Sequence, residues 1–267
     1  MGRASIRQVR AAGADRRADG GWRREHPVNG TFLHIAFDSL AWLAAGGSLF
    51  WLVRSAKVRF PASPAGDLRY IAALVFGAGL GAYLFGTANQ WLSHQTGIAR
   101  SIEGAIVGGV IAVELYKRAS GIASRTGARF ALPLAVGVAV GRLGCFFAGL
   151  DDFTYGTPTA LPWGRDFGDG IARHPVQLYE SAAMAAFTLI YVWRVRRNDR
   201  FMIDNGFYLA VGFYGAQRFA WEFIKPYAAL MGPFTLFHLL SAALVAYAAI
   251  MIVTAPTSRS VDDRAFA

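Results

Sequence analysis

The chain has 267 residues, of which 54% are hydrophobic and only 16% are charged, and its formal net charge at pH 7 is +10. Soluble domains carry about 25% charged residues, so this composition argues against a soluble domain and favours an integral membrane protein. The basic balance fits attraction to a membrane surface. Because no nucleic-acid-binding motif accompanies it, we expect no nucleic-acid partner.

Long apolar stretches follow one another along the chain, and a helix needs about 20 such residues to cross the hydrocarbon core of a bilayer. Six stretches meet this requirement: 33–53, 70–92, 130–149, 176–195, 205–224 and 234–254. A weaker seventh at 102–116 is interrupted by Glu103 and Glu114. One run alone would fit a buried core helix, but this many leave no soluble layer to cover them. The sequence therefore predicts an all-α, polytopic integral membrane protein with about seven transmembrane helices.

Three segments are predicted from this pattern. Residues 1–30 form a basic N-terminal arm that we expect to be flexible, residues 31–254 form the seven-helix transmembrane domain, and residues 255–267 form a polar C-terminal tail. The first apolar run begins only near residue 31 and is long enough to span, which disfavours a cleavable signal peptide. Cys145 is the single cysteine, which excludes an intrachain disulfide.

The distribution of Lys and Arg predicts the orientation, since short cytoplasmic loops are enriched in these residues. The loops after the first, third and fifth spans are the basic ones: Arg54, Lys57, Arg59 and Arg69, then Lys117, Arg118, Arg125 and Arg129, then Arg194, Arg196, Arg197 and Arg200. We therefore expect the N-terminus outside and the C-terminus in the cytoplasm. The arginine-rich arm at 1–30 conflicts with this orientation. We interpret it either as a segment that binds anionic lipid or as residues ahead of the true start.

Glycines mark places of close approach. Three pairs stand four residues apart and predict tight helix packing: Gly77 and Gly81, Gly104 and Gly108, Gly137 and Gly141. Gly144, Gly149 and Gly156 lie near a loop, where we interpret them as positions that let the backbone approach a ligand.

Ionisable groups at membrane depth are costly and usually functional. On the predicted topology they come from six helices yet all fall in one outer layer: Asp38, Glu103, Arg142, His174, Glu180, Arg218, Glu222 and His238. Arg142 and Arg218, from different helices, are predicted to form a cationic cradle for a phosphate group. A lipid headgroup is the obvious phosphate at that depth.

Each of these side chains has an alternative interpretation. Arg218 has Glu222 four residues on, so an intrahelical ion pair would also explain it. Arg142 has no acid at helical spacing in its own span, so its partner lies elsewhere in the bundle or is a ligand. Tyr214 shares a helix face with Arg218 and is either a phosphate ligand or an interfacial aromatic. Glu114 we interpret as structural.

Four ordered blocks of sequence resemble the prolipoprotein diacylglyceryl transferase family over roughly residues 70–254. The blocks are Gly141-Arg142-Leu143-Gly144-Cys145-Phe146, Tyr155-Gly156 with Leu161-Pro162-Trp163-Gly164, Arg173-His174-Pro175 with Gln177-Leu178-Tyr179-Glu180, and Tyr214-Gly215 with Arg218-Phe219 and Glu222-Phe223. The resemblance implies a seven-helix enzyme of the bacterial inner membrane. Such an enzyme transfers a diacylglyceryl group from phosphatidylglycerol to the lipobox cysteine thiol of a prolipoprotein at the outer face. The implied partners are phosphatidylglycerol, membrane lipid and the prolipoprotein signal peptide, with no metal and no organic cofactor.

The resemblance also implies roles for individual residues. Arg142 and Arg218 would hold the headgroup phosphate, with Tyr214 assisting and Gly156 shaping the site. The expected catalytic residues are Glu103, Arg142, Arg218 and His174. The expected substrate-binding residues are Arg142, Arg218, Tyr214, Gly104, Gly144, Gly156 and Glu180.

Two departures from the family pattern keep other functions open. The family's His-Gly-Gly at the start of the third helix is here Glu103-Gly104-Ala105, and its asparagine after Gly-Arg-x-Gly is here Cys145. Glu103 is either a base in place of that histidine or the ion-pair partner of an arginine. Cys145 is either a covalent nucleophile or a packing residue. A transferase of the same fold with another acceptor, or a non-catalytic lipid-binding membrane protein, are the alternative functions.

Overall fold

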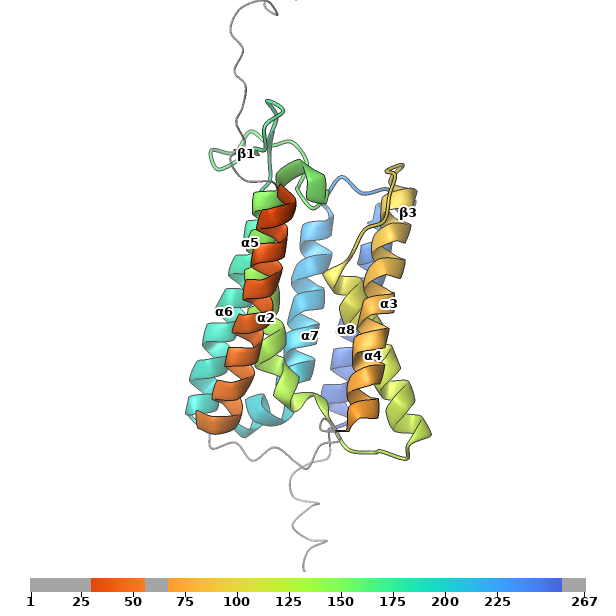
Figure 1. The fold of residues 1–267 in the computed structure, drawn as a ribbon, viewed down its shortest axis with the longest axis vertical. Helices are drawn as coiled ribbons and strands as arrows, with labels where there is room; N and C mark the ends of the chain where they lie inside the picture. The colour runs from red at the N-terminus through yellow and green to blue at the C-terminus, as the bar shows by residue number, and fades with distance from the viewer. Residues whose placement is uncertain (1–29, 56–66, 256–267) are drawn as a thin grey trace, which may run out of the picture.

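The computed structural model describes residues 30–55 and 67–255, which fold into a bundle of long helices that run up and down its long axis (Figure 1). The helices are α2 (Gly30–Ser55), α3 (Leu68–Leu92), α4 (Ile102–Ala119), α5 (Ala131–Ala148), α6 (Val176–Arg196), α7 (Arg200–Glu222) and α8 (Leu236–Val253). The predicted arm at 1–30 and the tail at 255–267 lie outside the described residues except for Gly30 and Ala255, as do Lys57 and Arg59.

Short elements connect these helices. Two 3-10 turns, η3 (Gly127–Phe130) and η4 (Gly149–Asp152), flank α5. Two antiparallel hairpins follow: β1 (Arg165–Asp166) with β2 (Ala172–Arg173), and β3 (Ala229–Met231) with β4 (Phe234–Thr235). Both hairpins project from the same end of the bundle, near the start of α2 (Figure 1).

Polar residues fix where several helices begin. The side chains of Asp67, Ser101 and Asp199 accept hydrogen bonds from the first free backbone N–H groups of α3, α4 and α7. Thr235 does the same for α8, and the His238 side chain in turn accepts a bond from the Thr235 backbone N–H. These caps satisfy donors that an apolar surrounding would leave without partners.

The described residues contain a long helix at each of the seven apolar stretches, and four windows are long and apolar enough to cross a membrane: Ile35–Arg54, Leu68–Leu92, Gly127–Asp152 and Leu236–Val253. The predicted all-α, multi-pass class is therefore confirmed. Helices α4, α6 and α7 carry more polar side chains. Their crossing, and with it the count of seven spans, stays a prediction.

The outward faces of the apolar helices are covered with large hydrophobic side chains. Trp42, Leu43, Leu68, Phe76 and Val253 are each between 72% and 84% exposed. A contiguous apolar surface of this kind is unfavourable in water. It suits the hydrocarbon core of a bilayer, where such side chains are solvated by lipid.

Glycines bring α3 and α4 into contact along their length. A Cβ atom on Gly77 would lie 2.6 Å from the backbone oxygen of Gly108, and one on Gly81 would lie 2.9 Å from the Gly108 Cα. The packing predicted for these glycines is thereby confirmed. Gly137 is less crowded, since its Cβ would lie 3.7 Å from Ala45 on α2. Helices α2 and α5 thus form a second close pair.

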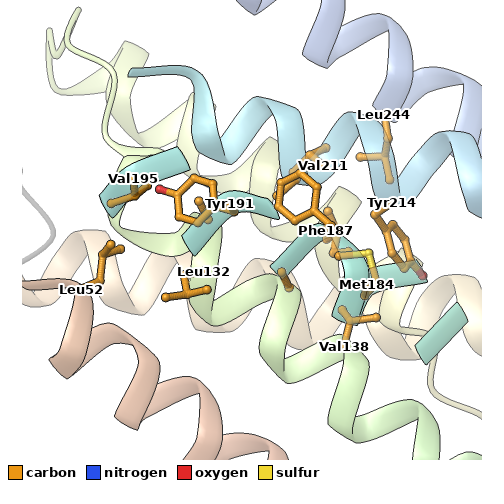
Figure 2. Close-up of a cluster of buried hydrophobic side chains, with 14 of the residues drawn as sticks. Leu52, Leu132, Val138, Met184, Phe187, Tyr191, Val195, Val211, Tyr214 and Leu244 are labelled. Atoms are coloured by element: carbon orange, nitrogen blue, oxygen red, sulfur yellow. The ribbon is translucent and has the colours of Figure 1, made fainter. Parts of the chain in front are cut away.

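A row of buried apolar side chains joins the helices in the interior (Figure 2). It begins at Leu52 and Val195, passes Tyr191 and Phe187, and ends beside Met184 and Tyr214 (Figure 2). Tyr214 is 0% exposed. The row therefore leads along the bundle to the ends of α6 and α7 that carry Glu180 and Arg218.

Candidate functional site

Six ionisable side chains meet at one end of the bundle, and we refer to them as the charge cluster. They are Glu103 in the first turn of α4, Arg142 near the end of α5, Glu180 near the start of α6, Arg218 and Glu222 at the end of α7, and Lys225 just after it. Because successive helices run in opposite directions, the ends of α5 and α7 lie level with the starts of α4 and α6 (Figure 1). This topology brings residues that are far apart in sequence together.

Glu180 lies at the centre of the charge cluster and contacts all three of its cations. Its Oε2 pairs with Nε of Arg142. Its Oε1 lies 2.9 Å from Nζ of Lys225 and 3.3 Å from Nη1 of Arg218. The sequence left the partner of Arg142 as either a residue elsewhere in the bundle or a ligand, and the structure pairs it with Glu180 on α6.

Arg218 joins the other two acids to this centre. Its Nε lies 3.2 Å from Oε2 of Glu103, and its Nη1 lies 2.8 Å from Oε2 of Glu222. The intrahelical pair that spacing suggested for Arg218 and Glu222 is confirmed. Glu222 is one of three carboxylates that the Arg218 guanidinium contacts, so an intrahelical pair alone does not account for Arg218.

Hydroxyl groups complete the partners of the acids. Ser241 on α8 donates to Oε1 of Glu103 at 2.6 Å, and Thr235 donates to Oε1 of Glu222 at 2.6 Å. Glu103 and Glu222 thus each have a cation on one oxygen and a hydroxyl group on the other, whereas Glu180 has cations on both. The arrangement holds the carboxylates in fixed orientations within an apolar surrounding.

All six side chains of the charge cluster are buried, with exposed fractions between 0% and 5%. Three carboxylates and three cations balance each other, so the cluster is formally neutral. Burying an ion costs several kcal/mol even after the protein relaxes, and pairing repays this only where the geometry is good. Since apolar residues would fill this space at lower cost, the charge cluster is a candidate for function rather than for stability.

Lys225 was not among the residues that the sequence assigned to the site. It lies three residues after Glu222 and seven after Arg218, so helical spacing was a signal that could have identified it. Burial, together with the neighbouring Arg218 guanidinium, lowers the pKa of Lys225 to about 8. Ser241 was also missed, because its distance from Glu103 in the sequence gave no indication of contact.

Tyr214 occupies the helix turn before Arg218, and its hydroxyl group is buried without a hydrogen-bond partner among the described residues. Burying a hydroxyl without a partner costs roughly 1–3 kcal/mol in proteins. Its predicted role as a phosphate ligand agrees with this placement. The residue is 0% exposed, so as an interfacial aromatic it would lie inside the bundle rather than on its surface.

His174 lies in the loop before α6 and makes no ion pair or hydrogen bond to the charge cluster within the described chain. Its Nδ1 is 3.4 Å from the Tyr179 hydroxyl, and its backbone oxygen accepts a bond from the Gly156 N–H at 2.9 Å. A Cβ on Gly156 would lie 2.7 Å from Val176. Gly156 therefore lets the loop pack against the start of α6, and the catalytic role of His174 stays a prediction.

The other two glycines expected at the site have neighbours that explain them. A Cβ on Gly104 would lie 2.9 Å from Phe85 of α3, and one on Gly144 would lie 2.6 Å from Phe37 of α2. Both positions hold helices together beside Glu103 and Arg142. Their predicted contact with substrate stays a prediction.

Cys145 lies against the charge cluster from the α5 side. Its Sγ is 4.0 Å from Nη1 of Arg142, and the residue is buried. A thiol in this position packs beneath the guanidinium. Its role as a covalent nucleophile stays a prediction.

The loop between α5 and α6 is folded by its own side chains. Oδ1 of Asp166 accepts backbone bonds from Gly168, Asp169 and Gly170, which lowers the pKa of Asp166. Asp169 binds Arg173 through two bonds of 2.7 Å, and this guanidinium lowers the pKa of Asp169. The loop is therefore an ordered cover at the end of the bundle that holds the charge cluster.

An apolar groove of about 400 Å³ runs between the α2–α5 pair and the α3–α4 pair. Near the charge cluster it is lined by Ile102 and Gly141, which directly precede Glu103 and Arg142. At its other end it reaches Glu114. Ile102 and Glu114 are twelve positions apart on α4, which corresponds to a rise of about 18 Å, close to the depth of one leaflet of the hydrocarbon core.

Among residues 30–55 and 67–255, no group of His, Cys, Asp and Glu side chains is arranged to hold a metal ion. The acids of the charge cluster contact cations and hydroxyl groups instead. The geometry suits a ligand that has an anionic group joined to an apolar tail. A phospholipid has this structure.

Comparison with known proteins agrees with this chemistry. A family model described as prolipoprotein diacylglyceryl transferase matches residues 41–254. Relatives from Geobacter sulfurreducens and Methylococcus capsulatus are both named phosphatidylglycerol–prolipoprotein diacylglyceryl transferase. The first is 33% identical over 181 residues, which is 63% of this chain and 68% of the relative. The second is 35% identical over 185 residues, which is 64% of this chain and 68% of the relative.

A relative of the same name from Coxiella burnetii covers more of the chain. It is 28% identical over 206 residues, which is 72% of this chain and 75% of the relative.

Proposed function

The chain belongs to the prolipoprotein diacylglyceryl transferase family, and from this premise we propose that it transfers the diacylglyceryl group of phosphatidylglycerol to the lipobox cysteine thiol of a prolipoprotein. The observation that carries the proposal is the pairing of Arg142 and Arg218, from separate helices, at one buried carboxylate beside an apolar groove. The enzyme is a transferase, and its substrates are a phospholipid and a secreted protein precursor.

The reaction forms one bond and breaks one. The thiol loses its proton, and the sulfur attacks the glycerol carbon that carries the phosphate. The carbon–oxygen bond to the phosphate breaks, and glycerol phosphate leaves with both electrons. Its phosphate therefore gains negative charge as the thioether forms, and fixed cations stabilise that charge in the transition state.

We propose that Arg142 and Arg218 stabilise the negative charge on the leaving phosphate. The protein contacts of each guanidinium are made by Nε and Nη1, and we assign the remaining amino group, Nη2, to the phosphate. A guanidinium binds phosphate oxygens through parallel N–H bonds. The unpartnered hydroxyl of Tyr214, one helix turn from Arg218, is a third donor for the same phosphate.

Glu103 occupies the position where the family has a histidine. We propose that its carboxylate accepts the proton of the substrate thiol. Its Oε1 accepts from Ser241, and its Oε2 faces Nε of Arg218. A carboxylate held in this way is a general base if the substrate thiol reaches it. Its second role is to hold Arg218 in place.

The apolar groove is the place we assign to an acyl chain of the lipid. It ends at Ile102 and Gly141, next to Glu103 and Arg142, so an acyl chain lying in it would bring the headgroup to the charge cluster. Burial of methylene groups contributes about 0.8 kcal/mol each, which supports holding a lipid by its tails.

The orientation we propose has all seven helices crossing the bacterial inner membrane, with the charge cluster toward the outer face. The cationic residues of the opposite end support it: Arg118, Arg125, Arg129, Arg194, Arg196 and Arg197. A reporter that fluoresces only in the cytoplasm should be active on the C-terminus and inactive on the N-terminus. The reverse result would overturn this orientation.

The function is tested with the purified full chain, phosphatidylglycerol with labelled acyl chains, and a lipobox peptide. We expect labelled peptide, and none when the peptide carries serine in place of cysteine or when phosphatidylethanolamine replaces the donor. Labelled lipid that is consumed without labelled peptide would instead support a same-fold transferase with another acceptor. Glu103 and Cys145, which depart from the family pattern, favour that second candidate. A folded protein that binds lipid but consumes none would support the non-catalytic alternative.

A further inference from the structure

Lys225 is a buried cation whose place in the site neither the motifs nor the family resemblance assigned. It lies three positions after Glu222, the last residue of α7. The side chains of Lys225 and Glu180 are both 0% exposed. The two lie 2.9 Å apart. The Tyr227 ring covers the ammonium group, with its centroid 5.7 Å from Nζ.

The charge balance of the site depends on this residue. Without Lys225, the charge cluster holds three carboxylates against two guanidinium groups, which gives a net charge of −1. A phosphodiester brings one more negative charge, and the phosphate leaving group carries a further one. In a buried site such like charges repel strongly, because water does not screen them. With Lys225 protonated the cluster is neutral before the lipid arrives.

Lys225 and the two arginines share one carboxylate. Glu180 is the one carboxylate that all three cations contact, and Lys225 approaches its Oε1 at 2.9 Å while Arg218 lies at 3.3 Å. A cation that satisfies Glu180 reduces the hold of this carboxylate on the guanidinium groups.

We propose that Lys225 is a positioning residue that neutralises Glu180 and so leaves Arg142 and Arg218 able to bind the phosphate of the lipid donor. This inference rests on the proposed function. Lys225 need not touch the substrate, because it acts through Glu180.

The proposal predicts a dependence on pH. Glu180 faces Lys225 from α6, Arg142 from α5, Arg218 and Glu222 from α7, and Tyr227 from its own loop. Burial and the Arg218 charge lower the pKa of Lys225 to about 8. Above that pH the lysine loses its proton, the cluster returns to a net charge of −1, and affinity for an anionic lipid falls.

The experiment compares the unaltered protein with Lys225→Arg and Lys225→Met between pH 6.5 and 9.5. At pH 7 we expect Lys225→Met to raise KM for phosphatidylglycerol about tenfold, and Lys225→Arg to stay within about threefold of the unaltered protein. Between pH 7 and pH 9, kcat/KM for phosphatidylglycerol of the Lys225→Arg variant, divided by that of the unaltered protein, should rise roughly tenfold. The reason is that a guanidinium keeps its proton over this range. Taking this ratio cancels the titration of the substrate thiol.

Lys117→Met is the matched control, since Lys117 is a buried lysine that pairs with Glu114 at the opposite end of the bundle. It should leave the pH profile unchanged. A kcat/KM ratio of Lys225→Arg to the unaltered protein that stays constant across this pH range would overturn the proposal. So would a Lys225→Met protein that loses active fraction and thermal stability while KM stays the same, because that pattern belongs to a structural lysine.

Failure of the proposed function would look different, since the unaltered protein would then transfer nothing at any pH. In that case the rise in Tm caused by phosphatidylglycerol decides the inference. That rise should fade above pH 8 in the unaltered protein and persist in Lys225→Arg. Equal fading in both proteins would overturn it.

Discussion

The two ends of the helix bundle carry ion pairs of different kinds. At the end that holds the charge cluster, Arg142, Glu180 and Glu103 pair with partners from other helices, and their side chains are at most 6% exposed. At the opposite end the pairs join near neighbours in sequence, as Lys117 does with Glu114, whose side chain is 38% exposed. Exposed local pairs contribute at most about 1 kcal/mol, whereas burying charges is costly.

We interpret this difference as one between charge that supports the fold and charge that serves the proposed reaction. Helices of this length form and pack without buried ions, because apolar contacts and glycine-mediated packing hold them together. The charge cluster therefore adds an energetic cost at one end only, beside the groove. Variants of matched type at the two ends test whether this distinction is correct.

The largest effect is expected from Arg142→Ala, which removes a proposed phosphate ligand and leaves Glu180 with one cation fewer. Transfer to a lipobox peptide should fall at least about 100-fold, the scale for losing a donor to a developing anion. Arg194→Ala at the opposite end, which breaks the pair with Asp199, should change transfer less than twofold. Full activity in Arg142→Lys would contradict a phosphate-binding role, because one ammonium cannot replace the paired N–H groups.

Glu103→Gln should follow closely, with a roughly 100-fold fall in kcat and little change in KM for phosphatidylglycerol. The amide still accepts from Ser241, so the substitution removes mainly the negative charge and the proton acceptor. Asp204→Asn, at an exposed carboxylate of α7 at the opposite end of the bundle, is the control and should behave like the unaltered protein. A raised KM with normal kcat would instead identify Glu103 as only the partner of Arg218.

Gly81→Ala tests the packing that places α4, and with it Glu103, at the site. The added Cβ would meet the Gly108 Cα at 2.9 Å, so we expect a loss of about 1–3 kcal/mol in unfolding free energy. Gly79→Ala on the same helix has no atom within 4 Å and should cost nothing. Unfolding by a titrated denaturing detergent measures both. Equal stability of the two variants would show that α3 and α4 can separate without strain.

The smallest effect is expected at the end without the charge cluster. A double-mutant cycle of Glu114→Gln and Lys117→Met should give a coupling energy below about 1 kcal/mol, because the residues are three apart on α4 and Glu114 is partly exposed. A coupling of several kcal/mol would remove the contrast between the two ends.

Much of the site was predictable from the sequence, because it depends on helix length and direction. Apolar stretches of about 20 residues located the helices, and alternating directions then placed Glu103, Arg142, Glu180 and Arg218 at one end. The glycine spacing likewise predicted the close contact of α3 with α4. These features follow from periodicity along the chain, which requires no knowledge of neighbouring helices.

The partners of these residues were decided only by tertiary structure. The sequence assigned Arg142 no partner, and the packing of α6 on α5 supplied Glu180. It did not identify Phe37 of α2 as the neighbour of Gly144. Lys225 and Ser241 entered the site for the same reason. Hydrophobic patterning determines which residues lie inside a helix bundle, but the rotation and contact of each helix determine which charges meet.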